Sequence, residues 1–142
     1  MDIKMFISFN IQNSSTGMDK AFRKKIKKKL IQDKKKLTKE LSSFARKDPR
    51  IKGNWMTLFP FFGTDRSHKD ENAEEIERYE NLLPVEHTLE LRLKKIDKAL
   101  ERVERSDFGR CQNCNKKIRK IRLEIVPEAD LCSVCGRSKD RK

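Results

Sequence analysis

The sequence predicts a mainly α-helical protein, an antiparallel coiled-coil helical hairpin followed by a small module built on four cysteines. Three observations lead to this fold class. Two long segments each carry one apolar stripe at helical spacing. All four cysteines stand in the last third of the chain, as two CxxC pairs. Only 5 Gly and 4 Pro occur in 142 residues, too few for an all-β protein with frequent turns.

The charge distribution limits the kinds of partner that the protein is expected to bind. The formal net charge is +13, with 35% hydrophobic and 40% charged residues. Residues 1–60 hold 16 basic and 5 acidic side chains, residues 61–90 hold 3 and 9, and residues 91–142 hold 16 and 8. Basicity favours an anionic partner such as nucleic acid, whereas the acidic middle segment is either repelled by phosphate or paired with basic neighbours. No apolar run approaches the roughly 18 residues of a membrane span, so we expect a soluble, cytoplasmic protein without a membrane partner.

The first predicted helix follows a leader, residues 1–17, whose polar end is typical of a poorly ordered loop. Apolar residues then recur at steps of 4, 4, 7, 4 and 3, which places them on one helix face over residues 19–46. The Asp48–Pro49 pair is expected to end the helix, because the residue before proline is disfavoured in the α region. The stripe consists of Phe22, Ile26, Leu30, Leu37, Leu41 and Phe44.

The segment 48–69 is predicted to be a long loop with an unusual share of aromatic residues. It contains Trp55, the only tryptophan, together with Phe59, Phe61 and Phe62. A loop of this length is generally functional or packed by its own side chains. Two interpretations stay open: the rings fold back onto the helices, or they form a contact surface for a partner.

The second predicted helix covers residues 70–105, about 54 Å at 1.5 Å per residue. Acidic residues crowd its first turns, where the helix dipole favours negative charge. Pro84 is expected to kink it, and Glu90–Lys94 is a favourable pair on its exposed face. Its later half has a heptad stripe made of Leu89, Leu93, Ile96, Leu100 and Val103.

Two helices with one apolar stripe each are expected to bury those stripes against each other. The hairpin then covers residues 18–106, with a tip at loop 48–69 and with basic residues 33–47 beside acidic residues 70–86. Its seam is expected to contain Leu37, Leu41, Leu93 and Leu100.

The cysteines form the strongest motif in the chain, C-x₂-C-x₁₇-C-x₂-C, made by Cys111, Cys114, Cys132 and Cys135. This spacing is typical of a structural zinc site, since four thiolates close a tetrahedral shell without an open position. Asn115 and Gly136, which follow the two pairs, tolerate a left-handed turn. Two disulfides, a redox CxxC or an iron–sulfur cluster are less favoured alternatives. The module is therefore predicted to be a C4 zinc finger over residues 107–136, followed by a basic tail at 137–142.

Apart from the cysteines, the sequence contains no motif that indicates catalysis. The sequence has no phosphate-binding loop and no nucleophile elbow, and it contains only 2 His. The paired carboxylates Asp70 and Glu71 stand at an exposed helix start, which does not suit acid–base catalysis. We therefore expect a protein that is not an enzyme.

Residues 89–135 resemble the DksA/TraR C4-type zinc-finger family. The resemblance rests on the heptad helix that ends in Asp107-Phe108-Gly109, on both CxxC pairs, and on Arg122-Leu123-x₃-Pro127-x-Ala129-x₂-Cys132 between them. It implies a monomeric regulator that binds RNA polymerase and inserts its coiled coil into the secondary channel. The zinc module braces the coil base outside, and the protein does not recognise DNA sequence itself.

The resemblance also implies an acidic tip with the pattern Asp-x-x-Asp-x-Ala, which falls on His68, Glu71 and Ala73. The alanine matches, Glu71 replaces one Asp and His68 replaces the other. Asp70 is expected to substitute in space for the missing carboxylate, so the expected tip set is Asp70, Glu71 and Ala73. Of the basic positions of the family's guanosine tetraphosphate site, only Lys95 aligns, so nucleotide binding is not predicted.

Two other functions remain open. One is a zinc ribbon that binds RNA, DNA or the ribosome through a basic surface; the other is a structural adaptor. The candidate basic contact residues are Lys95, Lys116, Lys117, Arg119, Lys120 and Arg122.

Overall fold

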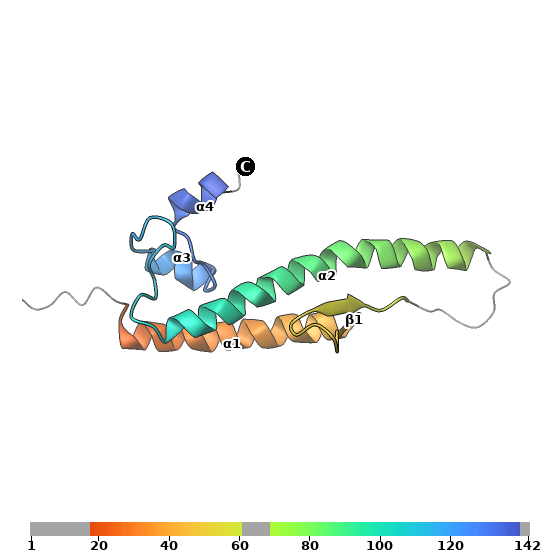
Figure 1. Ribbon diagram of the computed structural model, residues 1–142, viewed down its shortest axis with the longest axis horizontal. Helices are drawn as coiled ribbons and strands as arrows, with labels where there is room; N and C mark the ends of the chain where they lie inside the picture. Colours follow the sequence, from red (N-terminus) through yellow and green to blue (C-terminus); the bar gives the residue numbers. More distant parts are fainter. Residues whose placement is uncertain (1–17, 61–68, 140–142) are drawn as a thin grey trace, which may run out of the picture.

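The computed structural model is an elongated helical hairpin with a small module beside one end (Figure 1). It describes residues 18–60 and 69–139. The predicted leader 1–17, residues 61–68 of the predicted tip loop and residues 140–142 of the predicted tail lie outside the described residues. In chain order the elements are α1 (Lys20–Ser42), β1 (Ala45–Lys47), β2 (Trp55–Thr57), α2 (Lys69–Val103), α3 (Lys120–Ile125) and α4 (Ser133–Lys139).

The predicted antiparallel hairpin is confirmed. Helices α1 and α2 lie side by side over the length of α1 (Figure 1). Five residues of the predicted first stripe are buried in α1, whereas Phe44 lies beyond the end of this helix and is half-buried. In α2, the predicted stripe residues Leu89 and Leu100 are also only half-buried. Ala99 is fully buried there instead, because a small side chain lets the two backbones approach. The fully or almost fully buried seam residues are Ile26, Leu30, Leu41, Ile96, Ala99 and Val103.

Helix α1 ends earlier than predicted, at Ser42 rather than at Asp48. The chain then forms a short antiparallel pair, β1 with β2, in which Ala45 faces Thr57 and Lys47 faces Trp55. The predicted helix 19–46 is therefore wrong at its end, and residues 55–57 of the predicted loop form a strand. Asp48 helps to close the turn, because its carboxylate accepts a hydrogen bond from the Arg50 backbone N–H at 2.8 Å.

The hairpin β1–β2 brings its tryptophan back onto the helices. Trp55 is buried in the core, and the Lys47 ammonium lies 5.8 Å from the centre of its ring. Phe59 remains half exposed and contacts the ring of Tyr79 at a centroid distance of 5.3 Å. The first interpretation of the aromatic segment thus holds for Trp55, while Phe61 and Phe62 lie outside the described residues.

Helix α2 continues through Pro84 as one helix of 35 residues, and it changes direction along its length (Figure 1). The Glu90–Lys94 pair forms at 2.5 Å, but Glu90 is buried rather than on an exposed face. Ion pairs join the two helices farther toward the base, between Lys34 and Asp97 and between Lys27 and Glu104. Among the helices of residues 18–60 and 69–139, none is long and apolar enough to cross a membrane.

Candidate metal centre

The first cysteine pair is held in a tight turn directly after α2. Gly109 has φ +84°, a backbone conformation that favours glycine, and a Cβ there would lie 2.7 Å from the Met18 side chain. The Cys111 backbone N–H donates to the Lys116 carbonyl at 2.9 Å. Asn115 adopts the left-handed conformation expected of it, with φ 58°. This turn points both thiols of the pair to one side.

The second pair starts a short helix instead of a second left-handed turn. Cys132 precedes α4 and Cys135 lies within it, so Gly136 is helical, against the sequence expectation. A Cβ on Gly136 would lie 3.2 Å from the Arg122 guanidinium, which explains a glycine at this place by close approach. Helix α4 also includes Arg137 and Lys139, which the sequence assigned to a tail.

The four sulfur atoms of Cys111, Cys114, Cys132 and Cys135 lie within 4.8 Å of one another. Zinc–sulfur bonds of about 2.3 Å in a tetrahedron require sulfur atoms about 3.8 Å apart, and the Cys114 and Cys132 sulfurs lie 3.8 Å apart. All four cysteines are free thiols in the structure. The donor set and its spacing fit one structural zinc ion.

Electrostatics explain why this group of thiols suits a cation. Burial would raise the pKa of the Cys111 thiol, but backbone N–H groups of neighbouring residues hydrogen-bond its sulfur and lower its pKa to about 6. The pKa of Cys132 is lowered by the Cys135 backbone N–H. Asn113 donates to the Cys135 sulfur at 3.3 Å and lowers its pKa, yet the adjacent sulfurs outweigh this and raise the Cys135 pKa to about 11. Binding by all four sulfurs as thiolates therefore requires a positive ion between them.

The module is fixed to the base of the coil by both packing and charge. Phe108, Ile118 and Leu123 are buried in the same core as the α1 stripe. Three ion pairs surround these contacts and join three points of the module to the coil base. They are Lys25–Glu124 at 2.7 Å, Arg92–Glu128 at 3.0 Å and Lys120–Asp19 at 2.5 Å. No sequence pattern predicts these pairs, since their members lie far apart in the chain.

The candidate basic residues divide into two groups. Lys120 is engaged with Asp19, and the Arg122 guanidinium donates to the Leu131 carbonyl at 3.0 Å. These two side chains hold the module together and are less available to a partner. The remaining candidates are exposed, on α2 and on the loop before α3: Lys95, Lys116, Lys117 and Arg119.

The candidate tip residues lie at the other end of the molecule. Asp70 and Glu71 belong to the first turn of α2, while their side chains and His68 lie outside the described residues. Ala73 is exposed. Figure 1 places this start of α2 at the end of the hairpin opposite to α3 and α4.

Comparisons with known proteins agree with this architecture, although no family model matches the chain. The RNA polymerase-binding transcription factor DksA of Escherichia coli (strain K12) is 47% identical over 58 residues, covering 35% of this chain and 38% of that protein. The chain thus matches little more than a third of the length of this curated relative. An uncharacterized protein of Aquifex aeolicus (strain VF5) is 27% identical over 134 residues, covering 88% of this chain and 81% of the other.

A solved structure shares the fold over most of the chain. Transcription factor DksA2 from Pseudomonas aeruginosa superimposes with a TM-score of 0.61 at 22% identity, over 87% of this chain and 86% of the other. The sequence identity to DksA and the fold shared with DksA2 confirm that this chain resembles the DksA/TraR C4-type zinc-finger family.

Proposed function

We propose that this protein is a transcription regulator that binds RNA polymerase and inserts its coiled-coil tip into the secondary channel. The zinc module braces the base of the coil outside the channel. The observation that carries the proposal is the shape: a helical hairpin with the C4 module at one end and an acidic helix start at the other (Figure 1). The fold shared with DksA2 and the printed function of DksA support it.

The tip carries carboxylates, which are suited to a position close to the catalytic metal ions of a polymerase. Asp70, Glu71 and Ala73 come at the start of α2, and Glu74 follows them. A polymerase catalytic centre holds Mg²⁺, and carboxylates close to such an ion change how the metal or the substrate is positioned. The proposed regulator acts in this way on the enzyme and is not an enzyme itself.

The base has the rigidity that a brace requires. Ion pairs from both helices meet the zinc module, as Lys25 with Glu124 and Arg92 with Glu128. A module fixed in this way holds the coil at a constant angle, so the tip reaches a defined depth. We expect a cytoplasmic monomer, because one hairpin with one module supplies both contacts.

The test is co-purification with RNA polymerase, comparing the full chain with a variant whose tip is removed. Residues 61–76 are replaced by a short Gly-Ser linker, which is feasible because Phe59 and Tyr79 are already in ring contact across the gap. The core seam and zinc module are untouched, so the variant is expected to keep its zinc and its helical circular dichroism. We expect polymerase binding to be lost or strongly weakened. Unchanged binding of the shortened chain would contradict insertion of the coil.

One observation favours the alternative, a nucleic-acid- or ribosome-binding protein. Lys116, Lys117 and Arg119 are exposed and form no ion pair within the described part of the chain. Co-sedimentation with ribosomes, abolished by Gln at these three positions and by moderate salt, would support that function. Co-purification with polymerase that survives the same substitutions would support the first proposal.

A further inference from the structure

The outer face of α1 carries a row of lysines that the fold does not use. The lysines of this row are spaced by 4, 4, 7 and 4 residues, as are the apolar residues of the buried stripe. Each lysine stands two residues before a member of that stripe. Two residues correspond to about 200° around an α-helix, so the row lies on the side opposite to the core. All of its members are exposed, and none makes a hydrogen bond or ion pair with the residues that the structure describes. The outer lysine row consists of Lys20, Lys24, Lys28, Lys35 and Lys39.

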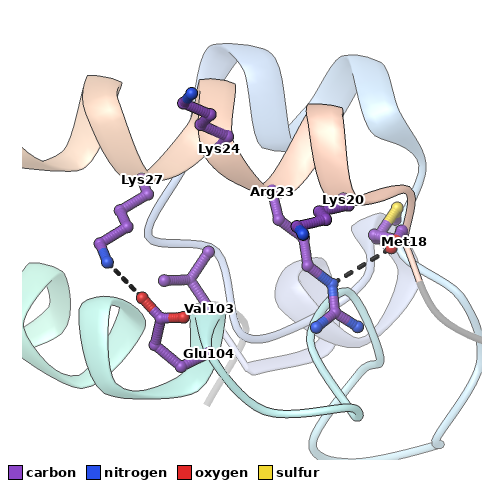
Figure 2. A pocket seen from close by; sticks show the side chains of 7 residues that line it. All are labelled: Met18, Lys20, Arg23, Lys24, Lys27, Val103 and Glu104. Atoms are coloured by element: carbon purple, nitrogen blue, oxygen red, sulfur yellow. Dashed lines mark hydrogen bonds and ion pairs between the residues drawn. The ribbon is translucent and has the colours of Figure 1, made fainter.

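Apart from Lys36, which is exposed and outside the row, the other basic residues of α1 have partners among the described residues. Lys25 pairs with Glu124, and Lys34 pairs with Asp97. Figure 2 shows this difference between two lysines at a cavity of about 530 Å³ at the start of α1. Lys27 points to Glu104, whereas Lys24 points away from Glu104. The helix therefore separates lysines that stabilise the fold from lysines that face outward.

The outer lysine row is unfavourable for the helix itself. No acidic residue stands three or four positions from any member, so the sequence provides no neutralising partner along the helix. Lys20 and Lys24, Lys24 and Lys28, and Lys35 and Lys39 are like charges at i,i+4, which repel each other. A row that destabilises its own helix is explained by a ligand of opposite charge.

We propose that the outer lysine row binds the phosphate backbone of duplex DNA without reading its sequence. The row extends over 19 residue steps of a regular helix, about 28 Å. Lysine side chains are sufficient to neutralise backbone phosphates, and contacts to phosphates carry no sequence information. This proposal does not depend on polymerase binding, because it concerns a different partner and is tested on the free protein.

Two other partners fit the row less well. Protein interfaces are depleted of lysine and rely on buried aromatic or arginine anchors, whereas Ile31 is the large apolar residue beside the row and is 39% exposed. Single-stranded nucleic acid is generally bound by stacking its bases on aromatic rings. Phe22 is the only aromatic residue of α1, and it is buried in the core. A duplex, which presents phosphates at fixed positions, matches a row of separate charges.

The experiment measures binding of the full, zinc-loaded chain to a fluorescent 20-base-pair duplex between 50 and 200 mM salt. Five phosphate contacts predict a salt slope of about −4.5, so affinity falls about 500-fold over this range. In the variant Lys24→Gln, Lys28→Gln, Lys35→Gln the slope becomes about −1.8, and affinity falls only about 12-fold. Gln has nearly the helix propensity of Lys, so the melting temperature is expected to stay the same or rise.

A matched control removes the same charge elsewhere. Lys52→Gln, Lys98→Gln, Lys139→Gln alters exposed lysines of the hairpin turn, α2 and α4, and we expect it to keep the full salt slope. Equal losses in both variants would overturn the proposal, since net charge alone would then account for binding. Loss only after Gln substitution of Lys116, Lys117 and Arg119 would also overturn it, by moving the contact to the zinc module. Absence of duplex binding, or tighter binding of the single strand, would overturn it as well.

Discussion

The two halves of α2 have different surroundings although they belong to one helix. The basal half, residues 89–103, packs against α1 and buries Leu93 and Ile96. The distal half, residues 69–88, leaves Ile76 and Leu83 50% and 40% exposed. The difference follows from length, because α1 has 23 residues and α2 has 35. Burial thus concentrates stability at the base, and the distal half keeps its side chains available for contacts.

The zinc module makes the contrast between base and tip stronger. It joins the core through Phe108 and Leu123 and pairs with the coil through Glu124 and Glu128. In the distal half, the Thr57 hydroxyl of the strand pair donates to the Glu86 carboxylate at 2.9 Å. Substitutions of the same kind are therefore expected to have large effects at the base and small effects toward the tip.

The largest effect is expected from loss of the metal. One zinc per chain should be bound, and Cys111→Ser should unfold residues 110–136, because zinc binding supplies about 10 kcal/mol or more to such modules. The coil should keep its helical circular dichroism, since its seam contains no metal ligand. Elemental analysis and amide hydrogen exchange measure the two effects. Freshly reduced protein without zinc would contradict this prediction.

The next largest effect on stability is expected from a Leu→Asp substitution in the basal half of α2, compared with the same substitution in the distal half. Leu93→Asp places a charge in the seam, where Leu93 is 7% exposed, and should lower the free energy of unfolding by about 3 kcal/mol. Leu83→Asp, at a 40% exposed position of the same helix, should change it by about 0.5 kcal/mol or less. Urea denaturation followed by circular dichroism measures both values. An equal loss in the free energy of unfolding for the two variants would show that the distal half is packed as tightly as the base.

Much of this contrast could be predicted from the sequence, because the apolar periodicity of residues 22–41 and 89–103 determines which faces meet. Ala99 could not be found in this way, since an alanine does not stand out in a hydrophobic pattern although its size permits close packing. The strands β1 and β2 were also missed. Each has three residues, too few for an alternating pattern, and they form because Trp55 is buried against the helices.

The cysteine spacing predicts the donor set of the metal centre, since ligands close in sequence must turn toward one ion. The roles of Lys120 and Arg122 could not be predicted, because their partners Asp19 and Leu131 meet them only after the module docks and folds. The same holds for Gly136, whose neighbour is the Arg122 side chain rather than a strained turn.

A smaller effect is expected at Glu90, where the two halves of α2 meet. Burial would raise the pKa of Glu90, but hydrogen bonds, chiefly from Lys94, outweigh it and lower the pKa below its usual value. A carboxylate with a lowered pKa stabilises the fold above its unfolded-state pKa of about 4.3, and this contribution is lost as the pH falls through the folded-state value. Glu90→Gln should therefore be less stable by about 1 kcal/mol at pH 7.

The difference in stability between Glu90→Gln and the unmodified chain should shrink as the pH falls through the folded-state pKa of Glu90. Thermal melts at several pH values measure it, and zinc release in acid affects both proteins alike. Glu101→Gln, at an exposed position of the same helix, serves as the control and should show no difference at any pH. A gap that widens in acid would contradict the assigned direction of the pKa shift.

The smallest effect on stability is expected at the tip, where the proposed function places the largest effect on transcription. Asp70→Asn with Glu71→Gln removes two charges from the first turn of α2, at a cost of at most about 1 kcal/mol per residue. If the flanks and base of the coil supply the contact area, polymerase affinity should stay within about tenfold, or 1.4 kcal/mol. Most of any effect on transcription should nevertheless disappear, because carboxylates near a metal centre act through charge and contribute little buried surface. Binding and transcription are therefore measured on the same double variant, with Glu101→Gln as a control away from the tip. Full regulatory activity of the double variant would instead assign the mechanism to steric blockage of the channel or to the aromatic segment around Trp55 and Phe61.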